Sequence, residues 1–345
     1  MITKTKLDDA ELSCLYDASG SATILADANG CIRYINPKLL FKASPVLRPS
    51  SQNQVNWLHF SDMKQSEVST AEADHLIYDL QQALLNHQLH LAAQPIFDFN
   101  SRQIKIIEVL LRWNHPTHGE ISPLTIIKLA SSYNLLFEVA SFVTHTALEF
   151  INKNRLKYRG VRFSINLNLP QITDTKLIKH LIKLIDDSGI DRAQIIFEST
   201  ETDSLPISVT EACQHFNHIR SQGIMIAMDD FGSGYSTLDY LNNLDVDIIK
   251  IDRSLVKDIE SNPRKLETLL AMLHLCKRIG VTTVIEGIEN HKQHRLLHNN
   301  DIQDILVQGY LYARPCRLTS LSNSSCPSWK TDSPSNALKT SNGAS

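Results

Sequence analysis

Residues 224–254 read IMIAMDDFGSGYSTLDYLNNLDVDIIKIDRS, and they contain two short apolar runs that each end on charged residues. The first run, 224–228, is followed at once by Asp229 and Asp230, and the second places isoleucines around Lys250. Short runs that are apolar throughout are typical of strands buried on both faces of a parallel sheet. The stretch therefore predicts two parallel strands with charged side chains at or near their carboxyl ends.

The paired aspartates admit two interpretations. Adjacent carboxylates repel each other and resist burial unless a cation joins them, and a hard divalent ion is the natural counter-charge. Asp229 and Asp230 could instead begin a solvated loop. Gly232 and Gly234 allow a sharp turn after them, before a helix expected at 235–241.

Strand and helix patterns alternate along most of the chain. Besides 224–228 and 247–252, strands are predicted at 89–97, 104–113, 161–167, 195–197, 281–285 and 305–307. Helices are predicted at 74–88, 123–133, 137–154, 175–187, 209–222 and 263–279. Almost every strand finishes on a polar residue. The order predicts an α/β barrel with its site on the C-terminal face.

Polar residues at the strand ends would converge on one mouth of such a barrel. They are Glu108, Asn166, Glu198, Asp229, Asp230, Glu286 and Gln308. Taken singly, each could be a satisfied core group or a helix cap, and a carboxylate within an apolar strand must be either ion-paired or a metal ligand. Taken together, the carboxylates exceed the cations Lys250 and Arg112. Oxygen ligands without clustered His or Cys favour Mg²⁺ or Mn²⁺ over zinc.

Composition narrows the class of protein. The 345 residues are 42% hydrophobic and 21% charged with a net charge of −3, which is ordinary for a globular protein and argues against a protein that wraps a nucleic-acid polymer. No apolar run approaches the roughly 20 residues needed to span a bilayer. We therefore expect a cytoplasmic protein. The six cysteines form no CxxC pair, which predicts free thiols: Cys14, Cys31, Cys213, Cys276, Cys316 and Cys326.

The two ends of the chain differ from its centre. Residues 1–70 contain short β-like runs around Asn29-Gly30, a hairpin signal, and then Asn36-Pro37. This segment resembles the opening of a PAS sensory domain, although a small hairpin packed on the main domain explains it equally well. Residues 71–318 form the main domain. Residues 319–345 are rich in Ser, Asn, Thr and Pro and are predicted to be disordered.

Seven segments match one family in order and spacing: IIEVLLRWNHP (106–116), SINLN (164–168), FESTE (197–201), DDFGSGYSTLDYL (229–241), VDIIKIDRSLV (246–256), VIEGIEN (284–290) and QGYLYARP (308–315). They resemble the signature segments of EAL domains, bacterial phosphodiesterases that hydrolyse cyclic di-GMP. The resemblance covers about residues 74–318. It implies a modified TIM (β/α)8 barrel with an antiparallel first strand, the linear product 5′-pGpG, and a homodimer.

The resemblance also implies a metal site. Glu108, Asn166, Glu198 and Asp229 match the ligands of a first metal ion, and Asp229 would bridge to a second ion held by Asp230. Two Mg²⁺ or Mn²⁺ ions are implied, with Ca²⁺ expected to inhibit.

Other matched positions imply catalytic and substrate-binding roles. Lys250 would orient the nucleophilic water, Glu286 would contact water at the metals, and Glu201 would brace the loop at 230–236. The positions matched to substrate binding are Gln94, Arg112 and Gln308, of which Gln308 would also contact water at the metals.

Several positions depart from the family pattern without removing a ligand. Val109 stands where the family has alanine, Ser131 and Asn134 where glutamate and glycine are usual, and Ser233 where threonine is common. The alternative function is a catalytically inert EAL module that acts as a cyclic di-GMP receptor or protein-interaction regulator with a regulatory protein partner. A third is a barrel metalloenzyme for another phosphoester. Inert modules usually lack the motif glutamate, a paired aspartate or the lysine, and this chain has all of them.

Overall fold

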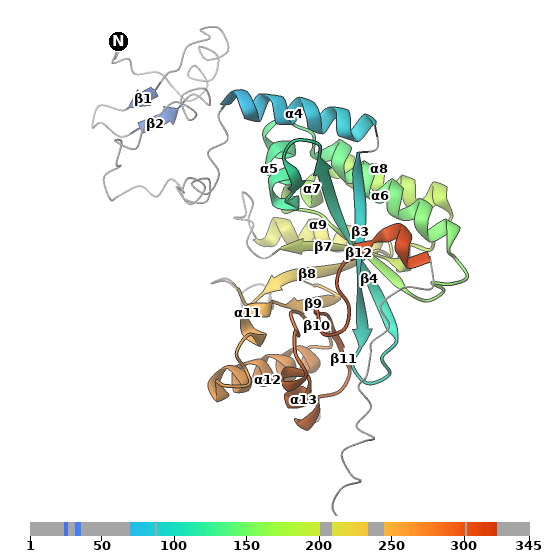
Figure 1. Cartoon of the computed structure of the whole chain (residues 1–345), viewed down its shortest axis with the longest axis vertical. Helices are drawn as coiled ribbons and strands as arrows, with labels where there is room; N and C mark the ends of the chain where they lie inside the picture. Colours follow the sequence, from blue (N-terminus) through green and yellow to red (C-terminus); the bar gives the residue numbers. More distant parts are fainter. Residues whose placement is uncertain are drawn as a thin grey trace, which may run out of the picture. The chain divides into compact units, whose positions relative to one another are not determined.

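The computed structural model describes residues 24–26, 32–35, 70–86, 88–200, 209–233, 245–300 and 302–322, and the chain divides into units at 1–78 and 79–345. In the first unit, strands β1 (Ile24–Ala26) and β2 (Ile32–Ile35) pair antiparallel, as the hairpin signal between them predicts (Figure 1). The wider PAS-like interpretation concerns residues outside the described ranges and stays a prediction. Helix α4 (Thr70–Leu85) contains the boundary between the units.

Within the described residues of the second unit, eight strands close into a barrel (Figure 1). In chain order these are β3 (Leu89–Asp98), β4 (Ile104–His115), β6 (Arg162–Asn166), β7 (Ile195–Thr200), β8 (Met225–Phe231), β9 (Ile248–Ile251), β10 (Thr282–Ile285) and β11 (Ile305–Val307). Neighbours from β4 to β11 pair in parallel, whereas β3 pairs antiparallel with both β4 and β11. The predicted barrel with an antiparallel first strand is confirmed.

Helices connect the parallel strands outside the barrel. They are α5 (Pro123–Ser132), α6 (Leu136–Lys153), α7 (Leu169–Thr173), α8 (Thr175–Ser188), α9 (Val209–Ser221), α11 (Arg253–Val256), α12 (Pro263–Arg278) and α13 (His291–Asn299), with a short 3₁₀ turn η2 (Arg192–Gln194). Local sequence sets their ends. Asp174 accepts hydrogen bonds from two backbone amides at the start of α8, and Gly189 ends that helix in the left-handed conformation. None of the described helices is long and apolar enough to cross a membrane.

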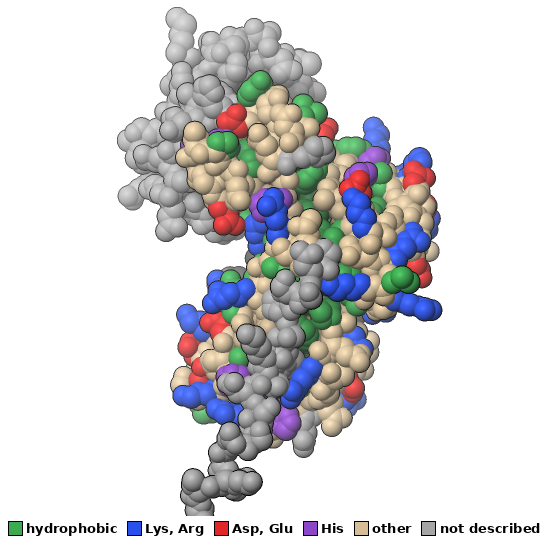
Figure 2. Space-filling view, turned by 45° about the vertical axis from the view of Figure 1, so that its right-hand side comes forward, with side chains coloured by type: hydrophobic (Ala, Val, Ile, Leu, Met, Phe, Trp, Pro, Cys, Tyr) green, Lys and Arg blue, Asp and Glu red, His purple; other side chains and the backbone are tan. Residues whose placement is uncertain are grey.

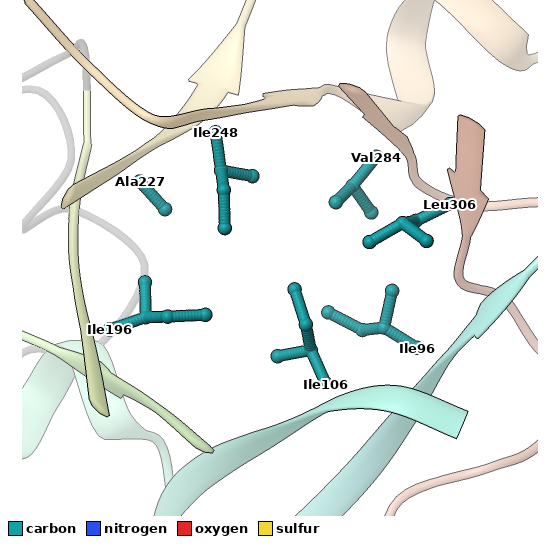
Figure 3. Packing of buried hydrophobic residues seen from close by; sticks show 7 residues of the cluster. All are labelled: Ile96, Ile106, Ile196, Ala227, Ile248, Val284 and Leu306. Carbon is teal, nitrogen blue, oxygen red and sulfur yellow. The ribbon is translucent and has the colours of Figure 1, made fainter. Parts of the chain in front are cut away.

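The interior of the barrel is filled by a ring of aliphatic side chains. Figure 3 shows these residues pointing inward from different strands: Ile96, Ile106, Ile196, Ala227, Ile248, Val284 and Leu306. All are 9% exposed or less. Burying them removes apolar surface from water and ties the strands together, so the ring forms a rigid floor rather than a pore.

Three short elements extend the barrel. Strand β5 (Gly119–Ile121) pairs antiparallel with β4, and β12 (Cys316–Arg317) pairs antiparallel with β3. The 3₁₀ turn η3 (Leu318–Ser322) follows, and its Leu321 carbonyl accepts a hydrogen bond from the buried Tyr158 hydroxyl. In the described part of the chain, Cys213, Cys276 and Cys316 are thiols outside any disulfide, as predicted for them.

Candidate active site

The candidate site is the layer of side chains directly above the aliphatic ring. Along a strand, residues two apart point to the same face. Each parallel strand therefore places its next inward residue one layer nearer the C-terminal mouth. Two positions after the aliphatic residues stand Glu108, Glu198, Asp229, Lys250, Glu286 and Gln308. Because β3 runs the other way, its contribution is Gln94, two positions before Ile96. The same spacing on each of these strands thus places their polar side chains in one ring.

Lys250 lies at the centre of this ring. Its ammonium Nζ is 2.8 Å from Glu286 Oε1, 3.0 Å from Glu198 Oε2, 3.0 Å from Asp229 Oδ1 and 3.6 Å from Glu108 Oε2. The Lys250 side chain is only 1% exposed. A buried ammonium needs such anionic neighbours, because water cannot solvate its charge.

Glu108 accepts hydrogen bonds from two side chains that are distant in the sequence. Asn166 Nδ2 donates to Glu108 Oε1 at 3.2 Å, and Gln308 Nε2 donates to Oε2 at 2.7 Å. The two donors come from β6 and from the residue after β11. The sequence left open whether Glu108 is ion-paired or a metal ligand. In the structure Glu108 Oε2 lies 3.6 Å from Lys250 Nζ, whereas Arg112 pairs with Glu120.

The paired aspartates lie within a strand, not after it. The sequence predicted that the strand ends before Asp229, but β8 continues through Phe231. Its pairing with β9 shifts register between Met228 and Phe231, and Asp230 adopts the left-handed conformation with φ 55°. Successive strand residues normally point to opposite faces, and a bulge removes that constraint. Here carboxylate oxygens of both aspartates lie within 4.8 Å of one belonging to Glu286.

Burial and mutual repulsion perturb the acids. Burial raises the pKa of Glu198 to about 8 and that of Glu286 to about 8, and it raises the pKa of Asp230 to about 6 with help from the charge on Asp229. Burial also favours neutral Lys250, but the carboxylates, Asp229 first, raise its pKa well above the ordinary value. The ring therefore keeps its cation charged and holds protons on some of its acids near neutral pH.

The residues present fit divalent metal ions. Two groups bring carboxylate oxygens within 4.8 Å of one another, Glu108 with Glu198 and Asp229, and Asp229 with Asp230 and Glu286. Asp229 belongs to both groups. Once bound cations have displaced the protons, five ionised carboxylates and one ammonium carry a net charge of −4, which two divalent cations would neutralise.

Two buried acceptors in the ring strengthen this fit. Gln308 Oε1 is buried without a hydrogen-bond partner among the described residues. Asp229 Oδ1 also lacks a well-aligned hydrogen bond there, although Lys250 Nζ lies nearby. Buried acceptors normally have partners, so these oxygens are suited to bind a cation.

The mouth of the ring is a small cavity of about 230 Å³. Gln94, Glu108, Asp229, Lys250, Glu286 and Gln308 all line it, together with Arg253, Glu289 and Tyr310 at its rim. Gln94 Nε2 donates to the Ala313 carbonyl at 3.0 Å, which fixes its side chain.

Of the predicted site residues that the structure describes, Arg112 remains outside this constellation. Arg112 Nη1 donates to the Leu111 carbonyl, Arg112 Nε lies 3.6 Å from Glu120 Oε1, and the residue does not line the cavity. Its substrate-binding role stays a prediction. Glu201 and the helix expected at 235–241 lie outside the described residues. Sequence reasoning missed Tyr310 and Arg253, although both fall within segments that match the family.

A family profile described as the EAL domain matches residues 77–315. The chain belongs to the EAL domain family. The site described above lies within the matched residues, as does every segment quoted from the sequence between 106 and 315.

Similar proteins carry the same domain in longer chains. The EAL domain is 30% identical over 244 residues to cyclic di-GMP phosphodiesterase NbdA of Pseudomonas aeruginosa, covering 70% of this chain and 31% of that protein. It is 33% identical over 245 residues to probable cyclic di-GMP phosphodiesterase PdeN of Escherichia coli, covering 70% of this chain and 46% of that protein. The chain therefore matches less than half the length of these curated relatives.

Solved structures show the same fold. The EAL enzyme Bd1971 in a form bound to cAMP and cyclic di-GMP superposes with a TM-score of 0.66 at 28% identity, covering 76% of this chain and 71% of that chain. The PaMucR phosphodiesterase in complex with cyclic di-GMP gives a TM-score of 0.65 at 27% identity, covering 72% of this chain and 99% of that chain.

Proposed function

We propose that this EAL domain hydrolyses cyclic di-GMP to linear 5′-pGpG, using two divalent metal ions, Mg²⁺ or Mn²⁺. The observation that carries the proposal is the ring of carboxylates around Lys250 at the C-terminal mouth of the barrel, with Asp229 shared by two potential metal sites. Relatives with this domain are named cyclic di-GMP phosphodiesterases.

The ligand roles follow from the two carboxylate groups. Glu108, Glu198 and Asp229 would hold one ion together with the Asn166 amide oxygen, and Asp229 and Asp230 would hold the second. Two divalent ions held by these residues would lower the pKa of a bound water and neutralise charge on the oxygens of the phosphodiester during an in-line displacement. Asn166 now donates to Glu108, so its amide would have to turn to offer its oxygen.

Lys250 supplies the positive charge that belongs to the protein itself. Its neighbours keep it protonated, its side chain is fixed by packing, and it lines the cavity in which the phosphate would lie. A preorganised ammonium at that position would orient the attacking water and stabilise charge that develops on the phosphate oxygens. Glu286, 2.8 Å from Lys250, would accept a hydrogen bond from the same water.

The experiment is turnover of cyclic di-GMP by the purified chain, measured as 5′-pGpG appearing with Mg²⁺, Mn²⁺ or Ca²⁺. We expect product with Mg²⁺ and Mn²⁺ and little with Ca²⁺, and loss of product in Asp229→Asn, which keeps the shape but removes the shared charge. Tight binding without product would make the domain a receptor instead. A linear phosphodiester that turned over as fast as cyclic di-GMP would indicate a different phosphoesterase.

Assembly and regulation are proposed from the sequence resemblance and not from the geometry of the site. We propose a homodimer, which light scattering of the purified chain would test. We also propose that residues 1–70 regulate the domain at 71–318, alone or through a regulatory partner. Deletion of residues 1–69 tests this, because an unchanged rate would exclude a role for those residues in turnover.

A further inference from the structure

We propose that Tyr310, backed by Arg314, is a stacking platform for a purine base of the substrate at the rim of the cavity. The proposal rests on the proposed function, since it assumes a cyclic dinucleotide in this site. It adds a residue that binds the base rather than the phosphate.

The size of the cavity requires a binding surface outside it. Its volume is about 230 Å³, below the roughly 300–1,000 Å³ of pockets that enclose a whole ligand. A cyclic dinucleotide that placed one phosphate against Lys250 would therefore leave at least one base at the rim. Tyr310 is the aromatic residue among those that line this cavity.

Tyr310 is one of the large side chains that the structure leaves exposed. It is 51% exposed, whereas Tyr312, two residues later, is 3% exposed. The Arg314 guanidinium lies over the Tyr310 ring, 4.3 Å from its centroid. This cation–π contact covers one ring face, so the exposed surface lies on the other face and the edge. An uncovered aromatic face among the residues that line the cavity is the feature that base stacking requires.

The backbone on both sides of Tyr310 is fixed. Ile288 N–H donates to the Gln308 carbonyl at 3.2 Å, and Leu311 N–H donates to the Ile288 carbonyl at 3.1 Å. A Cβ at Gly309 would collide with the backbone of Ile288, so this close approach requires glycine. Gln308 is in turn tied to Glu108. The ring is therefore held at a defined position relative to the proposed metal ligands, with little entropy left to lose on binding.

Charge explains why a base-stacking residue is useful here. The ring of carboxylates repels the phosphates of the substrate until cations neutralise it, whereas a purine stacks through its uncharged face. Stacking would therefore help to bind the substrate at a site where the phosphate contacts depend on bound metal ions. Stacking contacts the face of the base and not its hydrogen-bonding edge. It should therefore increase affinity more than it distinguishes guanine from adenine.

The test compares Tyr310→Phe, which keeps the ring, with Tyr310→Leu, which keeps the apolar bulk without it. We expect Tyr310→Leu to raise the KM for cyclic di-GMP by about 5- to 150-fold, with a smaller fall in kcat. Tyr310→Phe should stay within about threefold of the wild type. Arg314→Met should raise KM by less, and Arg314→Lys should restore it. The double variant Tyr310→Leu, Arg314→Met should bind no more weakly than Tyr310→Leu alone, because Arg314 acts through the ring.

Equilibrium binding of cyclic di-GMP with Ca²⁺ present separates this proposal from the phosphodiesterase. If the wild type binds cyclic di-GMP without turning it over, and Tyr310→Leu binds it more weakly, the result would support the stacking role of Tyr310 and overturn the proposed activity. If the wild type hydrolyses cyclic di-GMP, and Tyr310→Leu has the same KM and affinity, the result would overturn the stacking role of Tyr310 and support the proposed activity.

Discussion

Replacing Lys250 by methionine should destabilise the metal-free protein strongly. Met keeps most of the buried apolar stem and removes the ammonium that lies within 3.6 Å of four carboxylates. Removing one partner of a buried ion pair costs about 3–5 kcal/mol, because the other charge remains buried and unpaired. For a domain of this size, that loss lowers Tm by about 6–20 °C.

The assay is thermal unfolding in a chelator at pH 8.5, with Lys257→Met as the control. Lys257 is an exposed lysine in the same β9–α11 region, so its replacement should change Tm by no more than about 2 °C. Excess Mg²⁺ should shrink the Lys250→Met deficit, because divalent cations bound to the folded state supply the missing charge and stabilise it by mass action. Turnover should be lost with or without that recovery.

The pH dependence gives the same prediction a second test. Glu198 and Glu286 have pKa values raised from 4.5 to about 8, so the folded state keeps protons that the unfolded state releases between these values. Their contribution to stability is present at low pH and is lost as the pH rises through about 8. The Lys250→Met deficit should therefore be smaller at pH 6, where neutral carboxyls need no counter-charge. A variant that melts within about 2 °C of the wild type at pH 8.5 in chelator would refute the electrostatic account.

Three further predictions concern the same layer and its support. Binding of Mg²⁺ or Mn²⁺ at pH 7 should release protons from Glu198 and Glu286. The binding enthalpy measured by calorimetry should therefore change with the ionisation enthalpy of the buffer. Identical enthalpies in two buffers would contradict the raised pKa values. Val109→Ala, which restores the residue usual in the family, should lower the free energy of unfolding by about 2 kcal/mol. Val109 is 1% exposed, and the loss of its two methyl groups would leave a cavity. An unchanged or higher midpoint in denaturant unfolding would show instead that valine is overpacked. Gly309→Ala should cost about 3 kcal/mol by the same measurement, because its Cβ meets the Ile288 backbone, and wild-type stability would show that this approach can relax.

Much of the fold was accessible from sequence because buried parallel strands are short, apolar and bounded by polar residues. The run around Lys250 identified β9 to within a residue, and the alternation of strands and helices gave the barrel. Convergence of Glu108 and Gln308, 200 residues apart, followed from the rule that parallel strands in a barrel present their carboxyl ends at one face.

The parts that could not be read from sequence depend on tertiary contacts. Strands β5 and β12 are too short to carry a periodic pattern, and they exist because β4 and β3 offer free edges. The extension of β8 through Asp230 depends on a bulge at which Asp230 has a positive φ. Aspartate tolerates a positive φ better than most residues, so the sequence permits a bulge here but does not predict one. The side chain of Arg112 turns toward Glu120, a residue contributed by one of those unforeseen strands.

The antiparallel β3 also bears on how the protein folds. β3 and β4 form a local hairpin that can pair early, because the loop between them is short. The pairing of Leu306 and Val307 with Asp98 and Phe97 joins residues from opposite ends of the domain, so it has a large loop entropy to overcome and should form late. That same step brings Gln308 to Glu108. A folding intermediate that lacks β11 would therefore have most of the acidic residues but an incomplete site, so catalytic competence should arise only as the barrel closes.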